Sequence, residues 1–76
     1  MQVAGKIYSE TQILSTSNDS VTSPAFSFKE NSNTGIFHAG ADTLGISTAG
    51  TEKVRVDNVG NVGIGVVPIS TLDVNG

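Results

Sequence analysis

Residues 44–56 read Leu-Gly-Ile-Ser-Thr-Ala-Gly-Thr-Glu-Lys-Val-Arg-Val, and this stretch decides the fold. It holds two apolar doublets, Leu44 with Ile46 and Val54 with Val56. One residue separates the apolar positions within each doublet, and this alternation puts both side chains on one face of a β-strand. The stretch therefore predicts two short strands that follow each other closely, each with one apolar side.

The same doublet recurs six times between residues 26 and 74, and its first members follow at steps of 10, 8, 10, 8 and 10 residues. Such spacing is typical of short strands that follow one another as rungs. The doublets have twelve positions, of which His38 is one and the other eleven are apolar. We expect these eleven residues to be buried against copies of the chain: Phe26, Phe28, Ile36, Leu44, Ile46, Val54, Val56, Val62, Ile64, Leu72 and Val74.

Length and composition point to a structural element that assembles with itself. Seventy-six residues allow one small domain, which buries a modest share of its surface, and the chain has no cysteine to staple it. The net charge of -3 comes from seven acidic and only four scattered basic residues, which argues against nucleic acid as a partner. No apolar run reaches the length of a membrane span, so we expect no membrane insertion.

The chain divides into two parts at a polar loop. The first part, residues 1–24, holds a strand candidate at Gly5-Lys6-Ile7-Tyr8 and a loop over residues 15–24 that is rich in Ser, Thr and Asn. The second part, residues 25–76, is the run of β-rungs. Because no segment has a 3.6-residue apolar period, we expect an all-β, short-stranded fold with no significant helix.

Residues typical of turns separate the predicted strands. We expect turns with positive φ at Ala39-Gly40, Ala49-Gly50 and Val59-Gly60, and a further turn at Asn31-Ser32-Asn33. Pro68 cannot donate to a strand ladder, so we expect it at an edge or a corner.

Four further glycines, at positions 35, 45, 63 and 65, lie beside apolar doublet positions. A glycine inside a strand often marks a close approach of another backbone or a bend. Three chains crowded around one axis would need such glycines, and a tight two-layer sandwich is the alternative.

Two motifs stand together near the C-terminus, Gly-Asn-Val-Gly-Ile-Gly at 60–65 and Leu-Asp-Val-Asn-Gly at 72–76. With Pro-Ala-Phe-Ser-Phe at 24–28, Asn-Thr-Gly-Ile-Phe at 33–37 and the stretch from Asp42 to Asp57, they cover roughly two-thirds of the chain. In these stretches the chain resembles the repeats of bacteriophage tail-fibre and tail-spike proteins, a type that also occurs in large bacterial surface proteins.

The resemblance implies a shaft segment of a homotrimeric fibre that serves host attachment, built as a trimeric β-helix or β-prism. It implies that the eleven apolar residues form the trimer core, that the partners are the chain itself and adjacent fibre segments, and that the location is the virion or the cell surface. Such shafts often precede an intramolecular chaperone, sometimes self-cleaving, but no residue here matches one.

His38 is the single histidine, and on a three-fold axis three imidazoles would meet. Such a ring could suit zinc. The plainer interpretation is a solvated residue at a strand end, so we expect no metal and no cofactor. One histidine and scattered carboxylates give no catalytic cluster, so we expect no enzyme. The residues Asp19, Asp42, Asp57 and Asp73 are expected to serve as turn or capping residues.

The most charged strand lies between Thr51 and Asp57. By alternation Lys53, Arg55 and Asp57 point away from Val54, where they either form ion pairs between chains or are solvated. By the same alternation, Glu52 is expected to point to the same face of the strand as Val54.

Two alternative functions follow from the same residues. One is a receptor- or glycan-binding fibre module, with recognition by the loop 15–24 or by an exposed Phe37. The other is a repeat of a bacterial surface fibre or of a self-assembling extracellular fibre.

Overall fold

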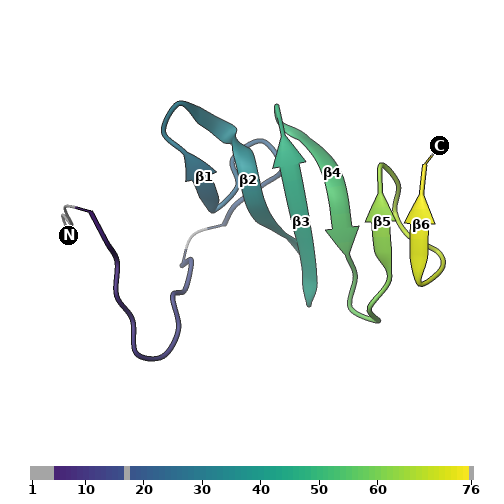
Figure 1. The fold of residues 1–76 in the computed structure, drawn as a ribbon, viewed down its shortest axis with the longest axis horizontal. Helices are drawn as coiled ribbons and strands as arrows, with labels where there is room; N and C mark the ends of the chain where they lie inside the picture. The colour runs from purple at the N-terminus through teal and green to yellow at the C-terminus, as the bar shows by residue number, and fades with distance from the viewer. Residues whose placement is uncertain (1–4, 17, 76) are drawn as a thin grey trace.

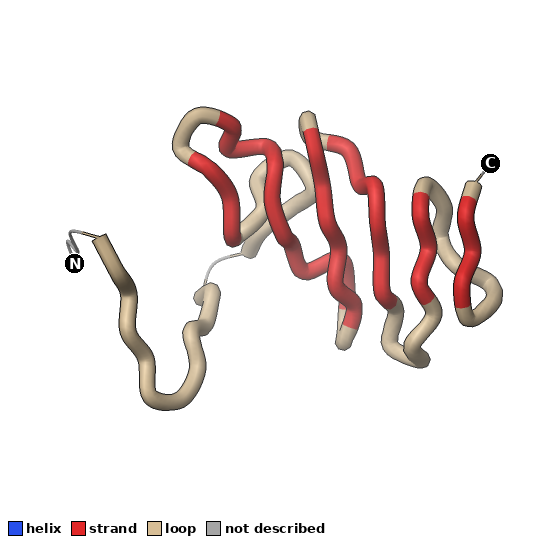
Figure 2. Tube along the Cα trace, viewed as in Figure 1, coloured by secondary structure: helices blue, strands red, loops and turns tan. Residues whose placement is uncertain are grey.

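The chain folds as a single β-sheet whose strands lie side by side in chain order (Figure 1). The computed structural model describes residues 5–16 and 18–75. Within these ranges there is no helix (Figure 2), which confirms the expected all-β class. No helical segment of the described chain has the length and apolarity that a bilayer crossing demands. The strands are β1 Phe26–Phe28, β2 Asn31–Gly40, β3 Thr43–Thr48, β4 Thr51–Val56, β5 Val62–Ile64 and β6 Leu72–Val74.

The first five strands form an antiparallel meander, and β6 then pairs with β5 in parallel. The parallel pair requires a crossover, and residues 65–71 make it by passing over one face of the sheet, where Pro68 is buried. The Pro68 ring thus lies outside every ladder, as expected, but it packs over one face of the sheet at Gly63 and not at an edge or a corner.

The turn between β3 and β4 is the two-residue turn that the sequence predicted. Thr48 pairs with Thr51 across it, and both central residues have positive φ, Ala49 at 53° and Gly50 at 76°. Two positive φ values define the primed turn whose twist matches that of an antiparallel hairpin. The predicted positive φ of Gly60 is also confirmed, at 91°.

Two of the predicted turns are wrong by a few residues. Strand β2 continues through Gly40, and the turn lies at Ala41-Asp42, with Asp42 at a φ of 52°. At the other end of β2, residues 31–33 belong to the strand and the turn is Lys29-Glu30. A register shift between Ser27 and Phe28 explains the second error. Because of this shift Phe28 pairs with Asn31, so β2 begins at Asn31 and residues 31–33 belong to the strand.

The strand expected at Gly5–Tyr8 is also wrong. Residues 5–16, which we call the N-terminal arm, form no strand and are exposed throughout. The arm extends beyond β1, away from the sheet (Figure 1). The described residues of the predicted loop 15–24 are a loop, closed by a short bridge between Ser20 and Ser23.

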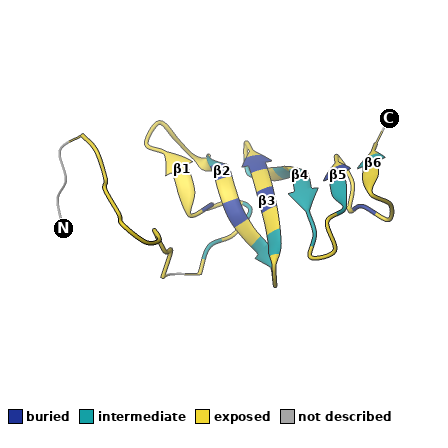
Figure 3. Cartoon of the chain, turned by 60° about the horizontal axis from the view of Figure 1, so that its bottom comes forward, coloured by how far each residue is buried: buried dark blue, intermediate teal, exposed yellow. Residues whose placement is uncertain are grey.

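The fold leaves much of its surface open to water (Figure 3). Its accessible surface is 5955 Å², against about 4,400 Å² for a compact monomer of its 7.8-kDa mass. Its radius of gyration of 14.0 Å likewise exceeds the roughly 11 Å of a compact domain of this length. Among the described large apolar side chains, only that of Phe37 is buried, at 7% exposure.

Candidate functional site

One face of the sheet carries a continuous row of apolar side chains that crosses all six strands. Directly paired residues of neighbouring strands project to the same face, so the pairings alone define this row. Each strand contributes one member: Phe26, Ile36, Ile46, Val54, Ile64 and Val74.

A second row runs beside the first, because each doublet from β2 to β6 supplies one residue to each row. It passes from His38 to Leu44, Val56, Val62 and Leu72 by direct pairing. Together the rows, which we call the apolar face, contain ten of the eleven predicted core residues. Phe28 is the exception, because the irregular register of β1 pairs it with Asn31.

The apolar face has no covering layer in the described chain. Its three valines at positions 54, 56 and 62 are half-buried, and its other apolar members are exposed. Along the first row, exposure is greatest at the two ends, with Phe26 at 52% and Val74 at 56%, and it is lowest at the half-buried Val54. A two-layer sandwich formed by one chain, which the sequence left open, is therefore not what the described residues build.

The opposite face is covered by the chain itself. The ring of Phe37 lies on Gly45, where a β-carbon would come within 2.5 Å of its Cε1 and Cζ atoms. The crossover lies on Gly63, where a β-carbon would meet the Val66 carbonyl oxygen and come within 2.7 Å of Pro68 Cδ.

These close approaches correct two expectations. The strand glycines 45 and 63 make room for residues of their own chain, not for three chains around an axis. Phe37 is buried by its contact with Gly45, so it offers no exposed ring for a glycan.

Arg55 and Glu52 form an ion pair on this opposite face. Arg55 Nη2 lies 2.9 Å from Glu52 Oε1, and Arg55 Nε donates to the same oxygen at 3.0 Å. Residues three apart in a regular strand face opposite ways, but a bulge in β4 sets both Glu52 and Lys53 against Ser47. The expectation that Glu52 shares the face of Val54 is therefore wrong, because simple alternation does not allow for the bulge.

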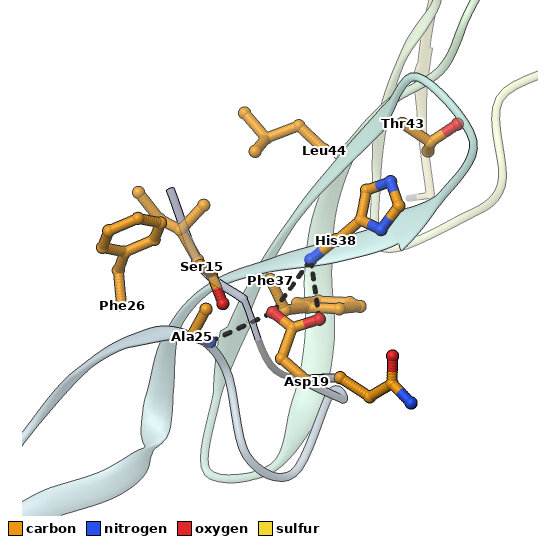
Figure 4. A pocket seen from close by; sticks show the side chains of 10 residues that line it. Ser15, Asp19, Ala25, Phe26, Phe37, His38, Thr43 and Leu44 are labelled. Carbon is orange, nitrogen blue, oxygen red and sulfur yellow. Dashed lines mark hydrogen bonds between the residues drawn. The ribbon is translucent and has the colours of Figure 1, made fainter. Parts of the chain in front are cut away.

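Asp19 closes the open edge of β2 beyond the end of β1 (Figure 4). Its carboxylate accepts hydrogen bonds from the backbone N–H of Ala25 at 3.0 Å and from that of His38 at 3.1 Å. Strand β1 pairs no further along β2 than Ile36, so the His38 N–H has no strand partner on that side. The capping role expected of Asp19 is thus confirmed, and its partner nineteen residues away could not be read from the sequence.

The other three aspartates differ in whether they lie in a turn, as expected, or in a strand. Asp57 is a turn residue as expected, since its Oδ1 accepts from the N–H groups of Val59 and Asn61. Asp42 lies in the turn before β3. Asp73 is instead the central residue of β6, paired with Gly63, so its predicted turn position is wrong.

The imidazole of His38 is exposed and lies near Thr43, on the side away from Asp19 (Figure 4). Among the described residues, no group of three or more His, Cys, Asp or Glu side chains could hold a metal ion. A ring of three imidazoles would need three chains, and it stays a hypothesis.

A cavity of about 340 Å³ lies where the loop before β1 meets the sheet. Ser15 and Asp19 of that loop line it together with Phe26, Ile36 and Leu44 of the apolar face. The cavity therefore connects the base of the N-terminal arm with the β1 end of the apolar face.

Comparison of the chain with known protein families, with curated proteins and with solved structures gives no match. The features that bear on function are therefore those of the chain itself: a polar face covered by its own residues and an apolar face left open.

Proposed function

We propose that the chain is a shaft segment of a homotrimeric β-fibre of the tail-fibre type. In this assembly each chain supplies one side of a three-sided prism, and the three apolar faces meet in its interior. The observation that carries the proposal is the apolar face itself, in which one row crosses all six strands, a second crosses β2 to β6, and neither is covered by the described chain.

The exposed area supports an assembly of this kind. The chain exposes roughly 1,600 Å² more than a compact monomer of its mass. Each chain of a cyclic trimer has two interfaces, and a standard interface buries about 800 Å² per partner. The excess is comparable to the area that two neighbours would cover, and it includes the surface of the exposed N-terminal arm as well as that of the apolar face.

The direction of the rows sets the direction of the fibre. Both rows run perpendicular to the strands, so an axis parallel to them lets each strand from β2 to β6 contribute a doublet to the interior, while β1 contributes Phe26. Neighbouring strands lie about 4.8 Å apart, so six strands advance the shaft by on the order of 25 Å. The opposite face, with Arg55 and Glu52, then faces water.

The function that follows is mechanical. The segment spaces and stiffens a fibre, and its trimeric register positions whatever the fibre carries. We place such a fibre on a virion or on a cell surface, where it serves attachment to a host.

The mass of the full chain in solution, by native mass spectrometry or light scattering, tests the proposal. We expect three times the 7.8-kDa chain mass. Ile46→Asp puts a charge in the middle of the apolar face, and we expect it to yield monomers that keep their β circular dichroism.

Val59→Asp is the matched control, because Val59 is also an exposed apolar residue but lies in a turn outside both rows. We expect this variant to remain trimeric. A monomer at every concentration, or equal masses for the two variants, would overturn the proposal.

A further inference from the structure

The N-terminal arm carries two pairs of apolar side chains among polar residues, yet it does not lie on its own sheet. Its four large apolar residues, Ile7, Tyr8, Ile13 and Leu14, are between 57% and 83% exposed. The hydrogen bonds described between Gly5 and Leu14 are local, from the Ser9 hydroxyl to the Gln12 carbonyl and from the Thr11 N–H to the Ser9 hydroxyl. They form a turn that folds the arm back on itself beyond β1 (Figure 2).

The arm joins the sheet at one end of the apolar face. Ser15, near the base of the arm, lines the 340 Å³ cavity together with Phe26, Ile36 and Leu44. The close view draws Ser15 together with Phe26 and Phe37 around this cavity (Figure 4). The arm therefore starts at the rim of the surface that the proposed trimer buries.

Symmetry and reach make a neighbouring chain accessible to the arm. Around a three-fold axis, equivalent residues of the three chains lie at the same height, so the base of one arm is level with the β1 end of the next chain. Twelve extended residues span up to about 40 Å, which exceeds the roughly 10 Å that separates the packed faces of two sheets. No unwinding of the sheet is needed for the arm to cross.

We propose that the N-terminal arm of each chain packs on a second copy of the chain, over the Phe26–Ile36 end of its apolar face. This inference rests on the proposed function. That end of the face is the one nearest to where the arms emerge, and its first-row residue Phe26 is half exposed. Three arms exchanged in this way close the β1 end of the shared interior, and each arm buries its own apolar residues.

Cysteine cross-linking tests the exchange cleanly, because the chain has no cysteine of its own. Ile13→Cys is made in one full-length chain and Phe26→Cys in another that carries a mass label. The two are unfolded, refolded together and oxidised, and mixed disulfides are counted by mass spectrometry. A disulfide needs Cα atoms within about 7 Å, and each chain has one thiol, so a mixed disulfide reports contact between chains.

Val74→Cys in place of Phe26→Cys is the matched control, because Val74 is equally exposed in the same row but at the opposite end of the sheet. We expect several-fold more mixed disulfide between Ile13→Cys and Phe26→Cys than between Ile13→Cys and Val74→Cys. The mass of the unoxidised mixture is measured in parallel.

The outcomes separate the two proposals. Trimers with the preferred disulfide support the exchange. Trimers with equal yields from the two pairs overturn the exchange and leave the shaft intact. A mixture that contains only monomers overturns both proposals.

Discussion

The Phe37 ring rests on Gly45, the residue directly opposite it in the neighbouring strand. This pair gives the polar side of the sheet its only large buried apolar side chain among the described residues. The ring therefore stabilises the pairing of β2 with β3 on the face of the sheet opposite the apolar face.

Gly45→Ala is expected to destabilise the fold by about 1–3 kcal/mol, because the added methyl group would overlap the Phe37 ring. Chemical denaturation measures the loss. Gly40→Ala is the control, since the nearest atoms to its β-carbon are those of Thr43 at 4.0 Å and its φ is not positive. Equal losses in the two variants would contradict the role given to the ring.

Ala49→Asn is expected to stabilise the fold by about 1 kcal/mol, because a left-handed backbone costs an ordinary residue roughly 1–2 kcal/mol and asparagine tolerates it better. The measurement is the midpoint of thermal unfolding. Ala41→Asn, in a neighbouring turn at a residue without positive φ, is expected to leave the midpoint nearly unchanged. A lower midpoint for Ala49→Asn would contradict the assigned turn.

Asp19→Ala is expected to cost about 1–2 kcal/mol, because the N–H groups of Ala25 and His38 lose the carboxylate that accepts from both. Hydrogen exchange of the His38 amide should quicken more than that of amides in β4. Glu30→Ala removes a carboxylate from an exposed turn, and it should neither lower the stability nor quicken the exchange of the His38 amide. An unchanged His38 amide would show that the cap is not formed in solution.

Arg55→Met is expected to lower the stability by less than about 1 kcal/mol, because the pair with Glu52 is only partly buried and lies within one chain. Its mass in solution should equal that of the unaltered chain. Dissociation of the Arg55→Met assembly would instead favour ion pairs between chains, the other role that the sequence allows for this strand.

The thermal midpoint of the full chain is expected to rise with chain concentration, because association stabilises the folded state by mass action. Calorimetry over a hundred-fold range of concentration measures the shift. Ile46→Asp, expected to be monomeric, should show no such dependence. A constant midpoint for both chains would contradict assembly through the apolar face.

Sequence periodicity predicted the strands and the apolar rows because both depend on local alternation. The doublets at 44–46, 54–56, 62–64 and 72–74 all lie in strands, and ten of the eleven apolar positions share one face.

Local alternation fails where a register shifts. The bulge at Lys53 moves Glu52 to the other face, and the irregular pairing of β1 separates Phe28 from the rows. Neither shift has a mark in the sequence that simple alternation would detect. The partners of Asp19 and of Gly63 depend on how a loop lies against the sheet, which residue spacing does not specify.

The order of the strands bears on how the molecule resists force. Each strand pairs only with its neighbours in the chain, and the first and last strands lie at opposite edges of the sheet. Tension between the two termini of a lone chain thus breaks the hydrogen bonds of the edge strands first and detaches the strands one after another. In a bundle of three such sheets, every strand that detaches must also expose its apolar-face residues to water, so resistance to tension comes from the contacts between chains.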